Sequence, residues 1–170
     1  GDNWGSEDTR RCIELLERGD EMGQLAAAAQ LHQLRQAARP AVPTLLSALP
    51  NSPLAVHRQI LHALSAIGDH RPEVMAAFVR DLTNQYPTLR IQGIQCLSQA
   101  GKAAQPYEAE LVRALNDRVP WFRANAAKAL GVPNARVNTL AKRVPREMEK
   151  PYLETLRRSP EARGVDWRET

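Results

Sequence analysis

The sequence predicts an all-α protein, organised as an α-solenoid of about four stacked helix pairs with a C-terminal helical cap. The first observation is a repeat. The stretch that begins at Leu89 starts 33 residues after a similar stretch at Val56 and 33 residues before another at Phe122. The second observation is composition: the chain is rich in Ala, Leu, Gln and Arg, and only 5% of its residues are aromatic. Such a composition favours helix, and a fixed period of this length is typical of stacked helical repeats.

The first helix pair is predicted at about residues 6–38. Ser6 is a suitable cap for a helix that carries acidic residues in its first turn, and Gly19 marks its end. The second helix runs from about Met22 to Ala38. It stops before Arg39-Pro40, because a proline disfavours helical backbone in the residue that precedes it.

Prolines and glycines mark the later boundaries, since proline fits the first turn of a helix and glycine commonly ends one. The remaining helices are predicted at 43–49, 54–67, 72–85, 87–100, 106–116 and 120–130, so that the later pairs cover about 40–68, 72–101 and 105–133. Two short helices at 134–143 and 145–158 are expected to form a cap over 134–160, followed by a tail at 161–170. The whole chain, 1–170, is expected to be a single domain.

Apolar residues recur in columns at the same interval. The second helices contribute a column of leucines and a second column, in which small residues allow neighbouring helices to approach each other closely. The first helices contribute three more columns. The members are Leu31, Leu64, Leu97 and Leu130; Ala27, Ile60, Gly93 and Ala126; Leu16, Leu49, Leu82 and Leu115; Cys12, Leu45, Phe78 and Leu111; and Ile13, Leu46, Val79 and Val112. These columns form an apolar face that a single helix pair cannot bury alone. We therefore expect the stability of the fold to come from the stacking of successive pairs.

The second helices resemble the HEAT-repeat family, in particular the short bacterial-type HEAT-like repeats of phycobilisome lyases. The resemblance rests on Val-His-Arg…Ala-Leu…Ile-Gly at 56–68, Leu-Arg…Cys-Leu…Ala-Gly at 89–101 and Phe-Arg-Ala-Asn-Ala-Ala-Lys-Ala-Leu-Gly at 122–131. It covers about residues 6–134 and implies a right-handed solenoid whose second helices line the concave face. It also implies a ladder between repeats, in which turn residues pair with basic residues that open the second helices: Asp117 with Arg123, Asn84 with Arg90, and Asn51 with His57. Phosphate contacts by the two arginines are the alternative.

No motif for catalysis or for metal or cofactor binding stands out. The four histidines, His32, His57, His62 and His70, show no metal-ligand spacing; His57 and His62 are five apart and point to different sides of a helix. Cys12 and Cys96 lie two repeats apart, too far for a disulfide. We therefore predict a non-enzymatic protein without cofactor or metal, although bilin lyases and alkyl-base DNA glycosylases of HEAT type are enzymes that remain alternatives.

The outward side of the second helices is predicted to be a polar stripe that binds a protein partner, as a scaffold or adaptor or as an antidote paired with a toxin. Amide side chains donate and accept hydrogen bonds without a charge to desolvate. Trp121 is a candidate anchor, because the repeat does not require a large ring there. The predicted partner-binding residues are Gln59, His62, Gln92, Gln95, Gln99, Trp121, Asn125 and Lys128.

Charge leaves a second possibility open. The net charge is +4, and the excess of basic residues lies in the C-terminal third, which could bind nucleic acid. A solvated cap surface over 136–158 is the plainer interpretation. No stretch is apolar over the ~18–20 residues of a membrane span, so no membrane contact, no small-molecule substrate and a cytoplasmic location are expected.

Overall fold

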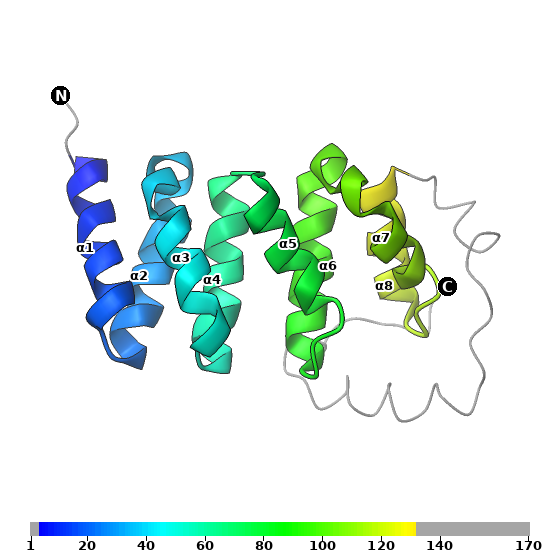
Figure 1. Ribbon diagram of the computed structural model, residues 1–170, viewed down its shortest axis with the longest axis horizontal. Coiled ribbons are helices and arrows are strands. Elements are labelled where there is room, and N and C mark those ends of the chain that lie inside the picture. Colours follow the sequence, from blue (N-terminus) through cyan, green and yellow to red (C-terminus); the bar gives the residue numbers. More distant parts are fainter. Residues whose placement is uncertain (1–3, 132–170) are drawn as a thin grey trace. The chain divides into compact units, whose positions relative to one another are not determined.

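The computed structural model describes residues 4–131, and all regular secondary structure in that range is helical (Figure 1). The α-helices are α1 (Trp4–Arg18), α2 (Glu21–Leu34), α3 (Val42–Ala48), α4 (Leu54–Ile67), α5 (Pro72–Asp81), α6 (Pro87–Ala100), α7 (Glu108–Ala114) and α8 (Pro120–Leu130). Short 3-10 helices cover Arg35–Ala41, Leu49–Asn51 and Gly101–Tyr107. The predicted all-α class is confirmed. The cap predicted at 134–160 and the tail at 161–170 lie outside the described residues.

Three of the four second helices, α4, α6 and α8, have the predicted bounds, and the differences elsewhere have local causes. Helix α2 ends at Leu34, because Arg35 takes a positive φ of 51° and the chain continues as a 3-10 helix through Pro40. Helix α5 ends at Asp81, four residues early. There the Asn84 amide donates to the Asp81 carboxylate, and the Tyr86 amide donates back to the Asn84 side chain. Such side-chain bonds compete with helix formation.

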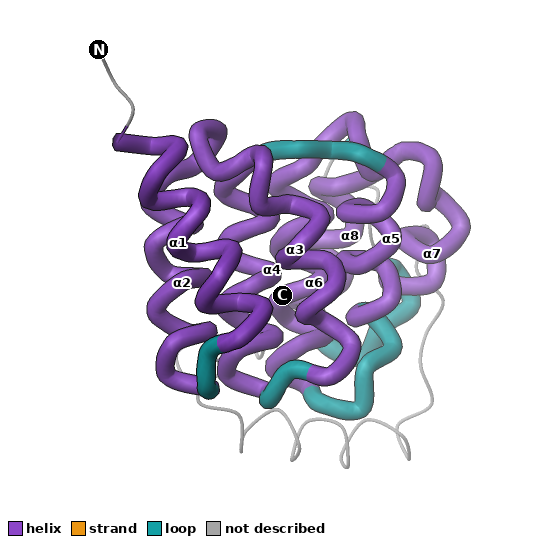
Figure 2. The backbone as a smooth tube through the Cα atoms, turned by 60° about the vertical axis from the view of Figure 1, so that its left-hand side comes forward, coloured by secondary structure: helices purple, strands orange, loops and turns teal. Residues whose placement is uncertain are grey.

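The chain forms two compact units, residues 1–77 and 78–170. The division falls inside α5, and the expectation of a single domain over 1–170 stays a prediction. In the first unit α1 packs on both α2 and α3, and α2 packs on α4. Within this unit α1 and α3 therefore form one layer and α2 and α4 the other. Figure 2 traces the loops that join successive helices. Leu16, Leu31, Leu45 and Leu64 are buried between these layers.

The second unit also pairs a second helix with its neighbours: α8 packs on both α6 and α7. Its core includes Phe78, Leu97 and Leu111. The leucine column is buried as predicted at its first three positions, and all four members of the small-residue column are buried. At Gly93 the backbones of α5 and α6 lie so close together that an added Cβ would be 2.8 Å from the Phe78 carbonyl oxygen.

One predicted column is not buried. Ile13, Leu46 and Val79 are only half-buried, and Val112 is 42% exposed. In each first helix this position directly follows a buried one, such as Cys12, and successive helical residues differ by about 100° in direction. The first helices therefore bury a narrower stripe than the sequence suggested.

Candidate functional site

In the second unit, the predicted binding residues lie on the neighbouring helices α6 and α8. Gln99 on α6 and Lys128 on α8 are exposed, while Gln95 and Asn125 are half-buried. Because α6 packs against α8, these two helices supply accessible polar groups to one layer. In the first unit Gln59 and His62 are half-buried on α4.

Gln92 does not belong to this accessible set, and the prediction that it faces outward is wrong. Its side chain is 7% exposed, and its amide nitrogen lies 3.6 Å from the sulfur of Cys96, one turn further along α6. Thr88, Ile91 and Ser98 are buried on the same helix. Helix α6 therefore buries side chains on more than one face. A single apolar stripe that packs on neighbouring helices would bury only one face.

Trp121 lies at the start of α8 and is only half-buried. Its ring meets the ring of the buried Phe122 edge to face, with centroids 5.5 Å apart and an interplanar angle of 83°. The Asn125 amide donates to the Trp121 carbonyl at 2.9 Å. The indole thus packs against the Phe122 ring of its own helix, and part of its surface stays accessible.

Arg90 and Arg123 make the same contact in two successive repeats. An Nη1 of Arg90 donates to the carbonyl of Asn84 at 2.8 Å, and an Nη1 of Arg123 donates to the carbonyl of Asp117 at 3.0 Å. The pairs expected from the family resemblance, Asn84 with Arg90 and Asp117 with Arg123, are therefore in contact. The bonds run to backbone oxygens within one helix pair, so these two arginines fix the turn before the second helix.

Charge separates the two kinds of helix. The second helices α2, α4, α6 and α8 contain four basic residues (Arg58, Arg90, Arg123 and Lys128) and a single acidic residue, Glu21. The first helices α1, α3, α5 and α7 contain eight acidic residues against five arginines. The layer formed by the second helices is thus almost without acidic groups.

The most strongly held ionic group is Asp69, in the loop after α4. Its side chain is 3% exposed and accepts hydrogen bonds from Arg39 Nε at 3.1 Å, from Arg71 Nε at 3.0 Å and from the Arg71 backbone amide at 3.0 Å. The side-chain hydrogen bond from Arg71 holds the pKa of this carboxyl well below its ordinary value, and the bond from Arg39 adds to it although burial opposes. This cluster joins the loop to the chain before α3, which is a structural role.

Two histidines that sequence analysis treated separately lie together in the first unit. The rings of His32 on α2 and His62 on α4 have centroids 6.0 Å apart and are tilted by 55°. Burial, and then the charges of Arg58 and His32, lower the pKa of His62. The signal was available: the two positions are 30 apart, one turn short of the repeat interval, which places them on facing turns of neighbouring helices.

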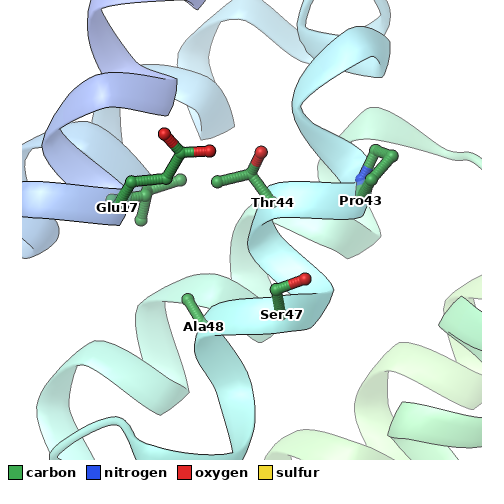
Figure 3. Close-up of a pocket in the computed structure, with 6 residues that line it drawn as sticks. Glu17, Pro43, Thr44, Ser47 and Ala48 are labelled. Carbon is green, nitrogen blue, oxygen red and sulfur yellow. The ribbon is translucent and has the colours of Figure 1, made fainter.

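A surface pocket in the first unit has a volume of about 300 Å³ and lies between α1 and α3, in the layer of first helices (Figure 3). Leu16, Glu17, Pro43, Thr44, Ser47 and Ala48 line it. Glu17 points toward Thr44, and it is the only titratable group of the lining. The pocket therefore offers no acid–base pair.

Both cysteines are buried, and neither is part of a disulfide. Burial, followed by the charge of Asp8, raises the pKa of Cys12, which makes this thiol a poor nucleophile.

Among residues 4–131 no group of three or more His, Cys, Asp and Glu side chains is arranged to hold a metal ion. No helix in that range is long and apolar enough to cross a membrane.

No protein-family model matches the chain, and a search of the curated proteins yields no match. The HEAT resemblance consequently rests on the residues of the chain itself.

Proposed function

We propose that the chain is a HEAT-like scaffold without enzymatic activity that binds a protein partner through its second helices. The observation that carries the proposal is the character of that layer: in each unit it combines accessible amide and cationic side chains with an almost complete lack of acidic groups. In the second unit Gln95, Gln99 and Lys128 are the reachable groups, and Trp121 adds a partly exposed ring. Aromatic and polar groups on rigid helices are suitable anchors for a protein interface.

The stripe is best tested by charge reversal in the second unit. The double variant Gln95→Glu/Lys128→Glu changes two accessible side chains, so the melting temperature should change little. Co-purification of the partner with the full chain should be lost, because two negative charges replace an amide and a cation.

A matched control places the same kind of charge in the other layer. Thr44→Glu alters the layer of first helices, near the pocket between α1 and α3, and should leave the partner bound. If the partner stays with the double variant, or is lost equally from the control, the second helices of this unit are not the binding surface.

Nucleic acid is the competing partner, since a layer poor in acids also attracts phosphates. The basic segment 136–158 that suggested it lies outside the described residues. Arg90 and Arg123 already donate to backbone carbonyls, which favours a protein. Binding of DNA or RNA would weaken steeply with salt because each phosphate contact releases counterions. A shift of a labelled duplex or single strand at low salt, lost in moderate salt, would replace the protein proposal.

A further inference from the structure

We propose that His32 and His62 form a binding site for a divalent transition-metal ion of the zinc, nickel or copper type. The two imidazoles come from neighbouring helices of the first unit, α2 and α4, which pack against each other. Imidazole nitrogen is a preferred ligand of these ions. With two protein ligands the site is smaller than a structural zinc centre, and water completes the coordination. This proposal does not depend on the proposed partner binding.

The separation of the rings fits one shared ion. A metal–nitrogen bond of about 2.0–2.1 Å places an imidazole centroid roughly 3.2 Å from the metal. The centroids of two ligands are then about 5.2 Å apart on a tetrahedral zinc ion and about 6.4 Å apart when they lie opposite each other on a nickel or copper ion. The observed separation is 6.0 Å. A wider ligand angle, or side-chain rotation that moves the rings by under about 1 Å, closes the difference.

The electrostatics set the conditions for binding. A metal ion binds the neutral imidazole, so binding is measured at pH 7.5, above the ordinary pKa of a histidine side chain. The charge of Arg58 acts on His62 and opposes a bound cation, so the site should be weaker than an isolated pair. Both rings are half-buried, which leaves room for water on the ion.

The chain supplies its own controls. It contains four histidines, and all four lie within the described residues. His57 and His70 are therefore matched controls for His32 and His62. The untagged full chain, freed of metal with a chelator, is melted at pH 7.5 with about 1 mM Ni²⁺ or with the same concentration of Mg²⁺, which prefers oxygen ligands. Ni²⁺ should raise the melting temperature by several degrees and Mg²⁺ should not, because an ion that binds only the folded state stabilises it.

The variants assign the effect to the pair. His32→Gln and His62→Gln should each abolish the Ni²⁺ shift, whereas His57→Gln and His70→Gln should retain it. The proposal is overturned if the wild type shows no shift, or if the shift survives in either pair variant. A second measurement needs no variant: trace Cu²⁺ should broaden the imidazole NMR signals of His32 and His62 before those of His57 and His70. Broadening of all four to the same extent would also overturn it.

Discussion

Replacing Gly93 with alanine should destabilise the protein, although alanine forms helices better than glycine. Gly93 lies in the middle of α6, where it is buried against the last turn of α5. An added Cβ would lie 2.8 Å from the Phe78 carbonyl oxygen and 3.2 Å from the Cβ of Asp81. The first contact is to backbone, so no side-chain rotation can relieve it, and α5 and α6 must move apart.

The magnitude follows from two opposing terms. Alanine in place of a helical glycine gains about 0.5–1 kcal/mol from the lower flexibility of the unfolded chain. Forcing one extra carbon into a packed contact costs about 1–3 kcal/mol. We therefore expect a net loss of about 1 kcal/mol in the free energy of unfolding, within limits of about 0 and 2.5 kcal/mol. For a chain of this size, each kcal/mol lowers the melting temperature by roughly 2–4 °C.

Gly23→Ala is the matched control, because Gly23 also lies in a second helix. Its added Cβ would approach only side-chain atoms, Asp20 Oδ1 at 3.2 Å and Leu15 Cδ2 at 3.4 Å. Asp20 Oδ1 also accepts the hydrogen bond of the Gly23 amide that caps α2, so a shift of a few tenths of an ångström is enough to relieve the contact and small enough to keep the cap. Urea unfolding followed by circular dichroism should show Gly93→Ala less stable than the wild type and Gly23→Ala not comparably so. Equal or greater stability of Gly93→Ala would refute the reasoning that α5 and α6 are held at backbone contact.

Two further predictions concern the core and the ionic cluster. Leu97→Ala should lower the free energy of unfolding by about 2–5 kcal/mol, because Leu97 is completely buried; Gln99→Ala, at an exposed position of the same helix, should change it by less than about 0.5 kcal/mol. Asp69→Asn should cost about 1–3 kcal/mol at pH 7, because the charged hydrogen bonds to Arg39 and Arg71 are weakened. The folded-state pKa of Asp69 lies below its ordinary value of 3.8. The stability it contributes is therefore fully present above that pH and is lost progressively as the pH falls toward the lower folded-state pKa, so the difference between wild type and variant in urea titrations should begin to shrink below about pH 4.

The helices were predictable where the sequence repeats. Residues 54–67, 87–100 and 120–130 are helical as predicted, because proline opens each later second helix or directly precedes it, and glycine follows it. The predicted helix ends were wrong where a single side chain forms hydrogen bonds in the loop, as after α5, or where the chain continues as a 3-10 helix, as after α2. The early end of α5 at Asp81 depends on Asn84, whose bonds no periodicity reveals.

The candidate site was less predictable, because exposure is decided by what covers each helix. Gln59 and Gln92 occupy equivalent positions, yet only Gln92 is buried. The two side chains are chemically identical, so the difference in burial comes from the residues that surround each of them. The contact between His32 and His62 has another cause: the two residues are 30 apart in sequence and not 33, so they do not occupy equal positions in the repeat.

The repeats themselves give a criterion for separating fold from function. A position that the fold requires should carry the same kind of residue in every repeat, and the column Leu31, Leu64, Leu97 and Leu130 does so. A column that stays accessible is free of that requirement. Ala29, His62, Gln95 and Lys128 form such a column, half-buried or exposed at every position, and no two of them are chemically alike. Stacking alone does not select a histidine, an amide and a cation at equivalent positions. The differences within this column are therefore where selection for binding would be recorded: His62 belongs to the proposed metal site with His32, and Gln95 and Lys128 belong to the proposed partner-binding surface.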